Sequence, residues 1–218
     1  MVTRRTLVAV LLGLAAGAGA AEAQSLSLPP SPAAKPKQVH PAVAALRQCR
    51  ARIVTSLGTL EVDLLPDAAP NAARTFVKLA RQGHYDRTAF LAVFPGRMVL
   101  AGQPPGEGET GPTVAFEDSS EASFFGSHIP GTVAFDRGAG GGANVAGRLF
   151  INLRGRRHLD GDYTVFGLVT RGMEVARRIG ELPSESRDGR PVPLESVAIE
   201  RIVVTRRDEE PRETEAEE

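Results

Sequence analysis

The chain has 218 residues, with 26 basic and 26 acidic side chains and no formal net charge at neutral pH. This length suits one domain with extensions at its ends, and the balanced charge gives no reason to expect a nucleic-acid partner. The single cysteine, Cys49, excludes an internal disulfide. We interpret it as a small apolar residue in a short helix over 41–48; a link to another thiol is the alternative.

The two ends of the chain have biased compositions. Two arginines precede an apolar stretch, and small residues ending at Ala23 follow it, so residues 1–23 are predicted to be a secretory signal that is removed on export. An uncleaved membrane anchor is the alternative. The Pro- and Ser-rich residues 24–40 are typical of an extended linker. Residues 208–218 are strongly acidic and are predicted to form a disordered tail.

The domain is predicted between these ends, over residues 50–206. Apolar runs separated by turns containing Gly or Pro predict β-strands, and these runs cover 52–56, 60–64, 91–94, 97–102, 131–135, 148–151, 163–169 and 199–204. Apolar residues recur at helical spacing over 70–82 and 173–179. The glycine-rich stretches after Gln103 and over 138–142 have no periodicity and are predicted to be loops.

The stretch 88–112 carries a family resemblance. It is similar to the central motif of the cyclophilin-type peptidyl-prolyl isomerases, roughly T-x-F-H-R-V-I-P-G-F-M-I-Q-G-G-D followed by a glycine-rich loop. The matching residues are Thr88, Phe90, Val93, Pro95, Gly96, Met98, Gly102, Gly111 and Pro112. The family patterns L-D-G-x-[HY]-x-V-F-G-x-V and G-M-x-V follow in order at 159–169 and 172–175. The resemblance implies a mainly β fold, a closed eight-stranded antiparallel barrel capped by two short helices.

The resemblance also implies a substrate site. The family's F-H-R arginine donates a hydrogen bond to the prolyl nitrogen, but Ala92 stands at that position, so no catalytic residue is assigned. The residues implied to contact substrate are Met98, Phe150, Leu159, Tyr163, Arg97 and Arg148. For Met98, Phe150 and Leu159, the alternative is that they belong to the ordinary core of the barrel and do not contact substrate. Two arginines near one substrate should favour acidic residues beside the proline, and the chain's own acidic tail.

The implied function is peptidyl-prolyl cis–trans isomerisation on proline-containing segments of exported proteins, by an exported bacterial member of the family. Activity is expected to be weak because of Ala92. The alternative is a catalytically degenerate peptide-binding or chaperone module, and a purely structural envelope domain is a third reading. The histidines lack metal-ligand spacing, and we expect no metal or other cofactor. We also expect a periplasmic or secreted monomer with no stable membrane anchor, and a solvated basic loop over 154–157.

Overall fold

The computed structural model describes residues 41–103, 127–137 and 145–209. All of them belong to one compact unit, Gln38–Glu218. The predicted signal and linker, the glycine-rich loops and nearly all of the acidic tail lie outside the described residues. No helix within the described ranges is both long enough and apolar enough to span a bilayer.

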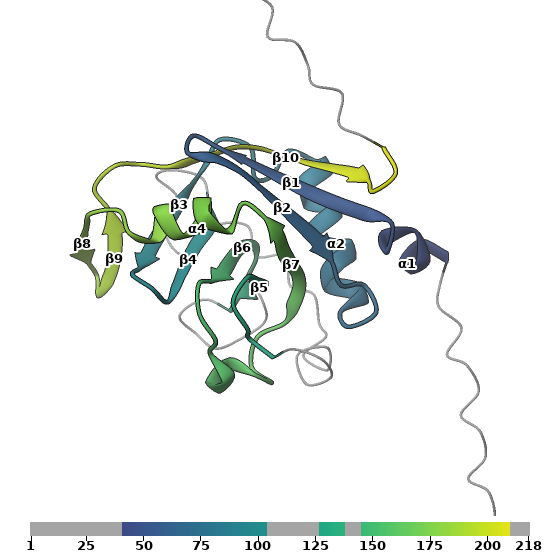
Figure 1. The fold of residues 1–218 in the computed structure, drawn as a ribbon, viewed down its shortest axis with the longest axis horizontal. Coiled ribbons are helices and arrows are strands. Elements are labelled where there is room, and N and C mark those ends of the chain that lie inside the picture. The colour runs from purple at the N-terminus through teal and green to yellow at the C-terminus, as the bar shows by residue number, and fades with distance from the viewer. Residues whose placement is uncertain (1–40, 104–126, 138–144, 210–218) are drawn as a thin grey trace, which may run out of the picture. The chain divides into compact units, whose positions relative to one another are not determined.

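The strands close into an antiparallel barrel in the order β1-β10-β3-β4-β6-β5-β7-β2 (Figure 1). Their bounds are Cys49–Thr55 (β1), Gly58–Leu64 (β2), Thr88–Phe94 (β3), Met98–Gln103 (β4), Thr132–Asp136 (β5), Val145–Asn152 (β6), Val165–Arg171 (β7) and Ala198–Arg206 (β10). The helices are α1 (Pro41–Leu46), α2 (Pro70–Arg81), α4 (Met173–Gly180) and the 3-10 turn η1 (Arg157–Leu159). The closed eight-stranded barrel predicted from the sequence is confirmed.

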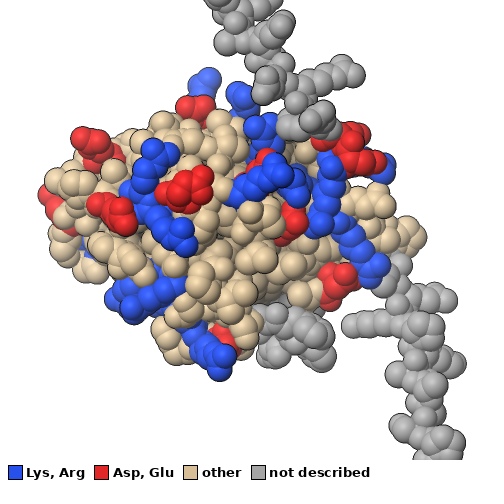
Figure 2. All heavy atoms as spheres, in the orientation of Figure 1, with Lys and Arg blue, Asp and Glu red and all other residues tan. Residues whose placement is uncertain are grey.

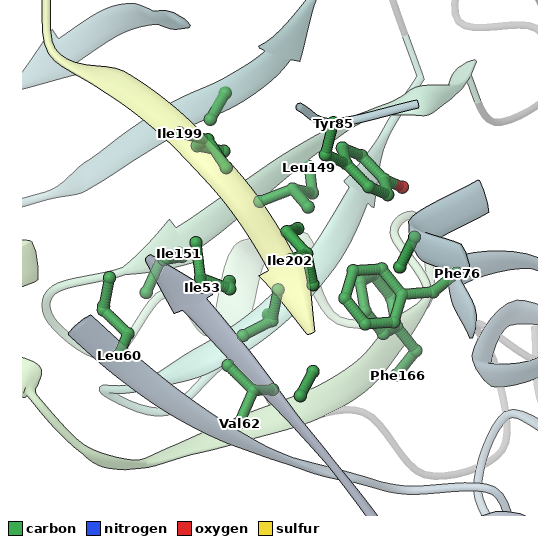
Figure 3. Close-up of a cluster of buried hydrophobic side chains, with 14 of the residues drawn as sticks. Ile53, Leu60, Val62, Phe76, Tyr85, Leu149, Ile151, Phe166, Ile199 and Ile202 are labelled. Carbon is green, nitrogen blue, oxygen red and sulfur yellow. The ribbon is translucent and has the colours of Figure 1, made fainter. Parts of the chain in front are cut away.

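The main core fills the barrel and is closed by α2 and α4 (Figure 3). Helix α2 begins with a proline, whose fixed φ suits the first turn of a helix. Its apolar residues lie on one face, and this face carries Phe76 into the core against Phe166 of β7, with ring centroids 4.9 Å apart. Both rings are fully buried. Burial of a side chain of this size stabilises a fold by about 1.5–3 kcal/mol relative to exposure.

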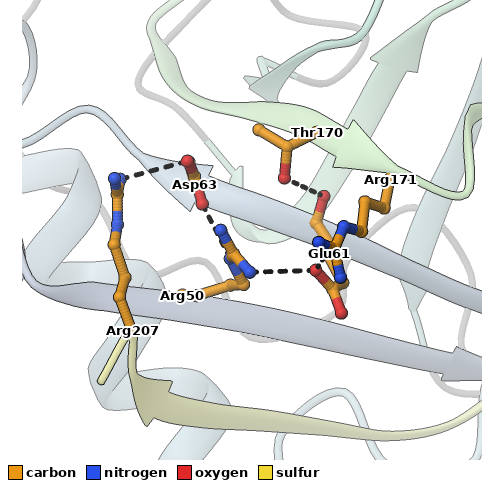
Figure 4. A network of polar contacts seen from close by, with 6 residues as sticks. All are labelled: Arg50, Glu61, Asp63, Thr170, Arg171 and Arg207. Atoms are coloured by element: carbon orange, nitrogen blue, oxygen red, sulfur yellow. Dashed lines mark hydrogen bonds and ion pairs between the residues drawn. The ribbon is translucent and has the colours of Figure 1, made fainter. Parts of the chain in front are cut away.

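A polar network ties the outside of β1 and β2 to their neighbours (Figure 4). Arg50 on β1 contacts both Asp63 at 2.9 Å and Glu61 at 3.0 Å on β2. Asp63 also pairs with Arg207, beyond β10, at 3.2 Å, and Glu61 lies 3.8 Å from Arg171 of β7. Because these four segments are adjacent around the barrel wall, the network reinforces the closure that the backbone hydrogen bonds establish.

The secondary structure departs from the sequence predictions at Cys49 and at one hairpin. Cys49 is buried at the start of β1 instead of belonging to the helix before it. A hairpin of β8 (Ser184–Arg187) and β9 (Arg190–Pro193) was not predicted. Its turn residues Asp188 and Gly189 both have positive φ, 50° and 77°. Asp-Gly is a common pair in two-residue hairpin turns, and it was the signal that could have found this hairpin.

Gly102 is predicted to be a position that tolerates no side chain. Its φ is +99°, and a Cβ atom there would lie 2.3 Å from the Gly147 carbonyl oxygen on the neighbouring strand. Gly102→Ala should lower the free energy of unfolding by about 2–5 kcal/mol, the sum of backbone strain and overpacking. Gly161→Ala is the matched control, because Gly161 has φ +86° but nothing within 4 Å of its Cβ position. It should cost only about 1 kcal/mol, and equal losses in urea unfolding would contradict the prediction.

Candidate functional site

Five apolar residues form a row across five neighbouring strands of the barrel, and we call this set the cross-strand row. The register pairs Ala92 of β3 with Leu100 of β4, and Leu100 with Phe150 of β6. Phe150 is paired in turn with Ala134 of β5, and Ala134 with Val165 of β7. Side chains directly opposite one another on antiparallel strands are in contact distance. The row is therefore one continuous strip of buried apolar side chains whose geometry is set by the barrel's hydrogen bonds.

The row lies on the outer face of the barrel. On β6, Leu149 and Ile151 belong to the main core, whereas Phe150 between them belongs to a separate apolar cluster. Successive side chains of a strand point to opposite faces of the sheet, so Phe150 points away from the barrel interior. The same alternation separates Ala134 from its neighbours on β5. The site is thus built on a wall whose inner side is the main core.

The apolar residues that the sequence assigns to the substrate site come together on this row. Phe150 is part of it, and Met98, Leu159 and Tyr163 are half-buried and pack against the same cluster. The Tyr163 ring meets Phe150 edge-on, with centroids 5.4 Å apart and an interplanar angle of 85°. The partly exposed members supply the apolar surface that a ligand can reach.

Ala92 is completely buried in the cross-strand row. Its methyl group has no hydrogen-bond donor, and no larger side chain fits at this position unless its neighbours move. Arg97, in contrast, is exposed in the turn between β3 and β4, where its carbonyl oxygen accepts a 2.9 Å hydrogen bond from the Leu153 N–H. The turn that carries Arg97 is therefore held against the end of β6.

Arg148 lies on the same face of β6 as Phe150, but its charge is already compensated. Its Nε donates to Asp136 Oδ2 of β5 at 2.9 Å, and its Nη2 contacts the same oxygen. Arg148 is only 3% exposed. The register of β5 and β6 thus gives Arg148 a carboxylate partner within the barrel, and its contact with a peptide stays a prediction. Asp136 was not identified from the sequence.

His128 and Asp160 lie against the site and were also missed. The His128 ring is fully buried and stacks on Phe150, with centroids 6.0 Å apart. Asp160 Oδ1 accepts the His128 backbone N–H at 2.7 Å and lies 2.9 Å from its Nδ1. The pKa of Asp160 is below its usual value: partial burial, the largest influence, raises it, but the hydrogen bonds and charge of His128 and the charge of Arg157 outweigh that effect. The ionised carboxylate thus fixes the ring that supports Phe150.

The basic loop after β6 is not simply a solvated loop. Arg154 and Arg157 are exposed, but Arg156 is buried and its Nη1 lies 2.6 Å from Met98 Sδ. A charged side chain is therefore present at the edge of the apolar cluster. The sequence could not show this contact, because it joins residues that are far apart in the chain.

Comparisons with known proteins agree with this architecture. The family model for "Cyclophilin type peptidyl-prolyl cis-trans isomerase/CLD" matches residues 50–204. Peptidyl-prolyl cis-trans isomerase-like 1 of Neurospora crassa is 32% identical over 154 residues, which cover 69% of this chain and 92% of the relative. The protein of the same name from Aspergillus niger is 34% identical over 158 residues, with 71% and 95% covered. Both relatives are fungal and lend no support to a bacterial, exported origin, which stays a prediction.

A solved structure shows the same fold. The cyclophilin type peptidyl-prolyl cis-trans isomerase of Cryptosporidium parvum, crystallised in the presence of the dipeptide Ala-Pro, matches with a TM-score of 0.64 and 26% identity. The match covers 72% of this chain and 98% of that one. With a family model over most of the chain and the same closed barrel, this chain belongs to the cyclophilin-type peptidyl-prolyl cis-trans isomerase family.

Proposed function

We propose that the protein binds proline-containing segments of exported proteins at the half-buried side chains packed against the cross-strand row, and isomerises the X–Pro bond slowly. Met98, Phe150, Leu159 and Tyr163 hold the proline ring in this proposal. The single observation that carries it is the apolar cluster on the outer face of the barrel, where half-buried Met98, Leu159 and Tyr163 pack against a buried row that has Ala92 at one end. The predicted signal at residues 1–23 is the support for exported clients.

The slow rate follows from the chemistry of the bond. Rotation about an X–Pro amide has a barrier of roughly 18–20 kcal/mol, because conjugation is lost in the twisted form. An apolar surface can bind the proline ring in both the planar and the twisted form of the amide. A cationic donor that points at the prolyl nitrogen favours the twisted form. Position 92 supplies only a methyl group. Loss of a donor that acts in the transition state costs about 10²–10³ in rate in other enzymes.

The test compares this protein with a cyclophilin that keeps the F-H-R arginine. We expect kcat/KM in a protease-coupled proline-peptide assay to be lower by about 10²–10³-fold, while NMR titration still detects peptide binding. Equal turnover in the two proteins would overturn the idea that Ala92 limits the rate. Binding without any acceleration would assign the alternative function, a peptide-binding or chaperone module. Failure to bind any proline peptide would reject both.

Ala92→Arg adds the missing donor and sharpens this test. Because the guanidinium would act on the twisted amide, it should raise turnover more than it raises peptide affinity. Ala92 is completely buried, so the longer side chain must also displace its neighbours, at a cost of about 1–3 kcal/mol or more. Turnover is therefore compared below the unfolding transition of the variant, determined by circular dichroism. Unchanged turnover in the folded variant would show that more than this one donor is missing.

A further inference from the structure

Arg156 is a nearly buried cation at the edge of the apolar cluster. It is 9% exposed, and its backbone N–H donates to the His128 carbonyl oxygen at 2.7 Å. Its Nη1 lies 2.6 Å from Met98 Sδ, and its Nη2 lies 3.3 Å from His158 Nε2. A thioether is a weak acceptor. The guanidinium has five N–H donors and is therefore far from saturated by these contacts.

No carboxylate neutralises this cation within the described part of the chain. Neither Arg156 nor its neighbours Arg97 and Arg154 forms an ion pair with any described residue. Burial and then the like charges of Arg97 and Arg154 lower the pKa of Arg156, and only Tyr163 opposes them. A buried charge without a counter-ion is unfavourable. Binding of an anion at this position would compensate the desolvation cost of Arg156 and offset the repulsion from Arg97 and Arg154.

Comparison with Arg148 shows that Arg156 lacks a carboxylate partner among the described residues. Both arginines are at least nine-tenths buried beside the same apolar cluster, but Arg148 has Asp136 as its partner. The contact to Met98 places the Arg156 guanidinium directly beside a residue of the proposed proline site. Figure 2 shows basic side chains gathered at the lower left of the molecule, where Figure 1 places the turn between β3 and β4. Among the described residues, Arg156 therefore lacks the carboxylate partner that Arg148 has, at a position beside Met98.

We propose that Arg156, assisted by Arg97, binds a carboxylate beside the proline, so that the site selects proline peptides with an acidic neighbour. This inference rests on the proposed proline-binding function and adds its substrate class. It replaces Arg148 with Arg156 as the residue that partners Arg97. The carboxylate comes either from a Glu or Asp side chain next to the proline or from the C-terminus of a peptide that ends in proline. Guanidinium groups suit both, because they bind carboxylates through two parallel hydrogen bonds.

The test measures peptide affinity by isothermal titration calorimetry in the full chain. The probes are short peptides with Glu-Pro or Gln-Pro, with Pro-Glu or Pro-Gln, and peptides that end in proline as the free acid or the amide. We expect the acidic member of at least one pair to bind about tenfold tighter than its neutral match at low salt, with the ratio falling at high salt. The pair that shows the preference identifies the source of the carboxylate.

Arg156→Gln should reduce this acid-to-neutral ratio to near one. Arg177→Gln on α4 is the matched control, an exposed arginine outside the apolar cluster, and should leave the ratio as in the wild type. Ratios near one in the wild type, or a ratio that Arg156→Gln leaves unchanged, would overturn the inference. Binding of neutral proline peptides in that case would leave the proposed function intact. Absence of binding by every peptide would reject the proposed function itself.

Discussion

Replacing Asp136 with alanine is expected to lower the free energy of unfolding by about 3–5 kcal/mol, a large effect for one side chain. The substitution leaves the Arg148 guanidinium without a counter-ion at a position that is 3% exposed. The Arg148 Nη1 is already buried without a hydrogen-bond partner among the described residues, so the neighbourhood has no spare acceptor for the charge. Urea unfolding followed by circular dichroism measures the loss.

A double-mutant cycle separates the pair from its parts. Asp136→Ala combined with Arg148→Met should recover most of the lost stability, because no buried charge is then left alone. Glu185→Ala is the control for an exposed ion pair, since Glu185 and Arg187 contact each other in the β8–β9 hairpin with side chains 47% and 65% exposed. It should change stability by less than about 1 kcal/mol. Additive losses in the cycle would show that the Asp136–Arg148 pair is not energetically coupled.

Phe150→Ala is expected to combine a loss of stability with a loss of peptide binding. The ring is 2% exposed, stacks on His128 and holds Tyr163 edge-on. Truncating a buried phenylalanine costs about 3–5 kcal/mol. Because the cavity opens in the cross-strand row and releases Tyr163, affinity for a proline peptide should fall at least about tenfold. Calorimetric titration at a temperature where the variant is folded measures this change.

Phe135→Ala provides the comparison for Phe150→Ala. Phe135 is also fully buried, but it points into the barrel and packs on Phe166 with centroids 4.4 Å apart. A comparable loss of stability is expected, with peptide affinity per folded molecule preserved. If both variants lose peptide affinity equally, the row has no special part in binding, and the loss reflects the condition of the whole barrel.

Most of the fold could be predicted because its signals are local. Pro95 and Gly96 break an apolar run, and this break placed β3 and β4 and the turn between them. Helix α2 begins at Pro70, where its sequence predicts a start. The β8–β9 hairpin was missed because β8 is polar and exposed and β9 has only four residues, so neither shows apolar alternation around Asp188 and Gly189. An alternating apolar pattern identifies strands that bury one face, and β8 buries none of its residues.

The apolar half of the site could be predicted, whereas its charged half could not. Met98, Phe150, Leu159 and Tyr163 follow a motif in the chain, and the fold brings them together. The partners of the arginines depend on long-range register. Asp136 reaches Arg148 only through the pairing of β5 with β6, and Arg156 reaches Met98 across 58 positions of sequence. Residue types alone could not indicate which cation is neutralised and which is left without a partner.

Closure of the barrel has a consequence for the form of recognition. Every barrel strand is hydrogen-bonded to a neighbour on each side, so the wall has no open edge to which a peptide could add as an extra strand. The cross-strand row also runs across the strands rather than along them. A segment bound as proposed would therefore gain no repeating main-chain ladder from the described barrel strands, and its contacts with them would be made by a few side chains around one residue. In the proposed mode, such contacts would favour brief engagement with many segments over stable capture of one.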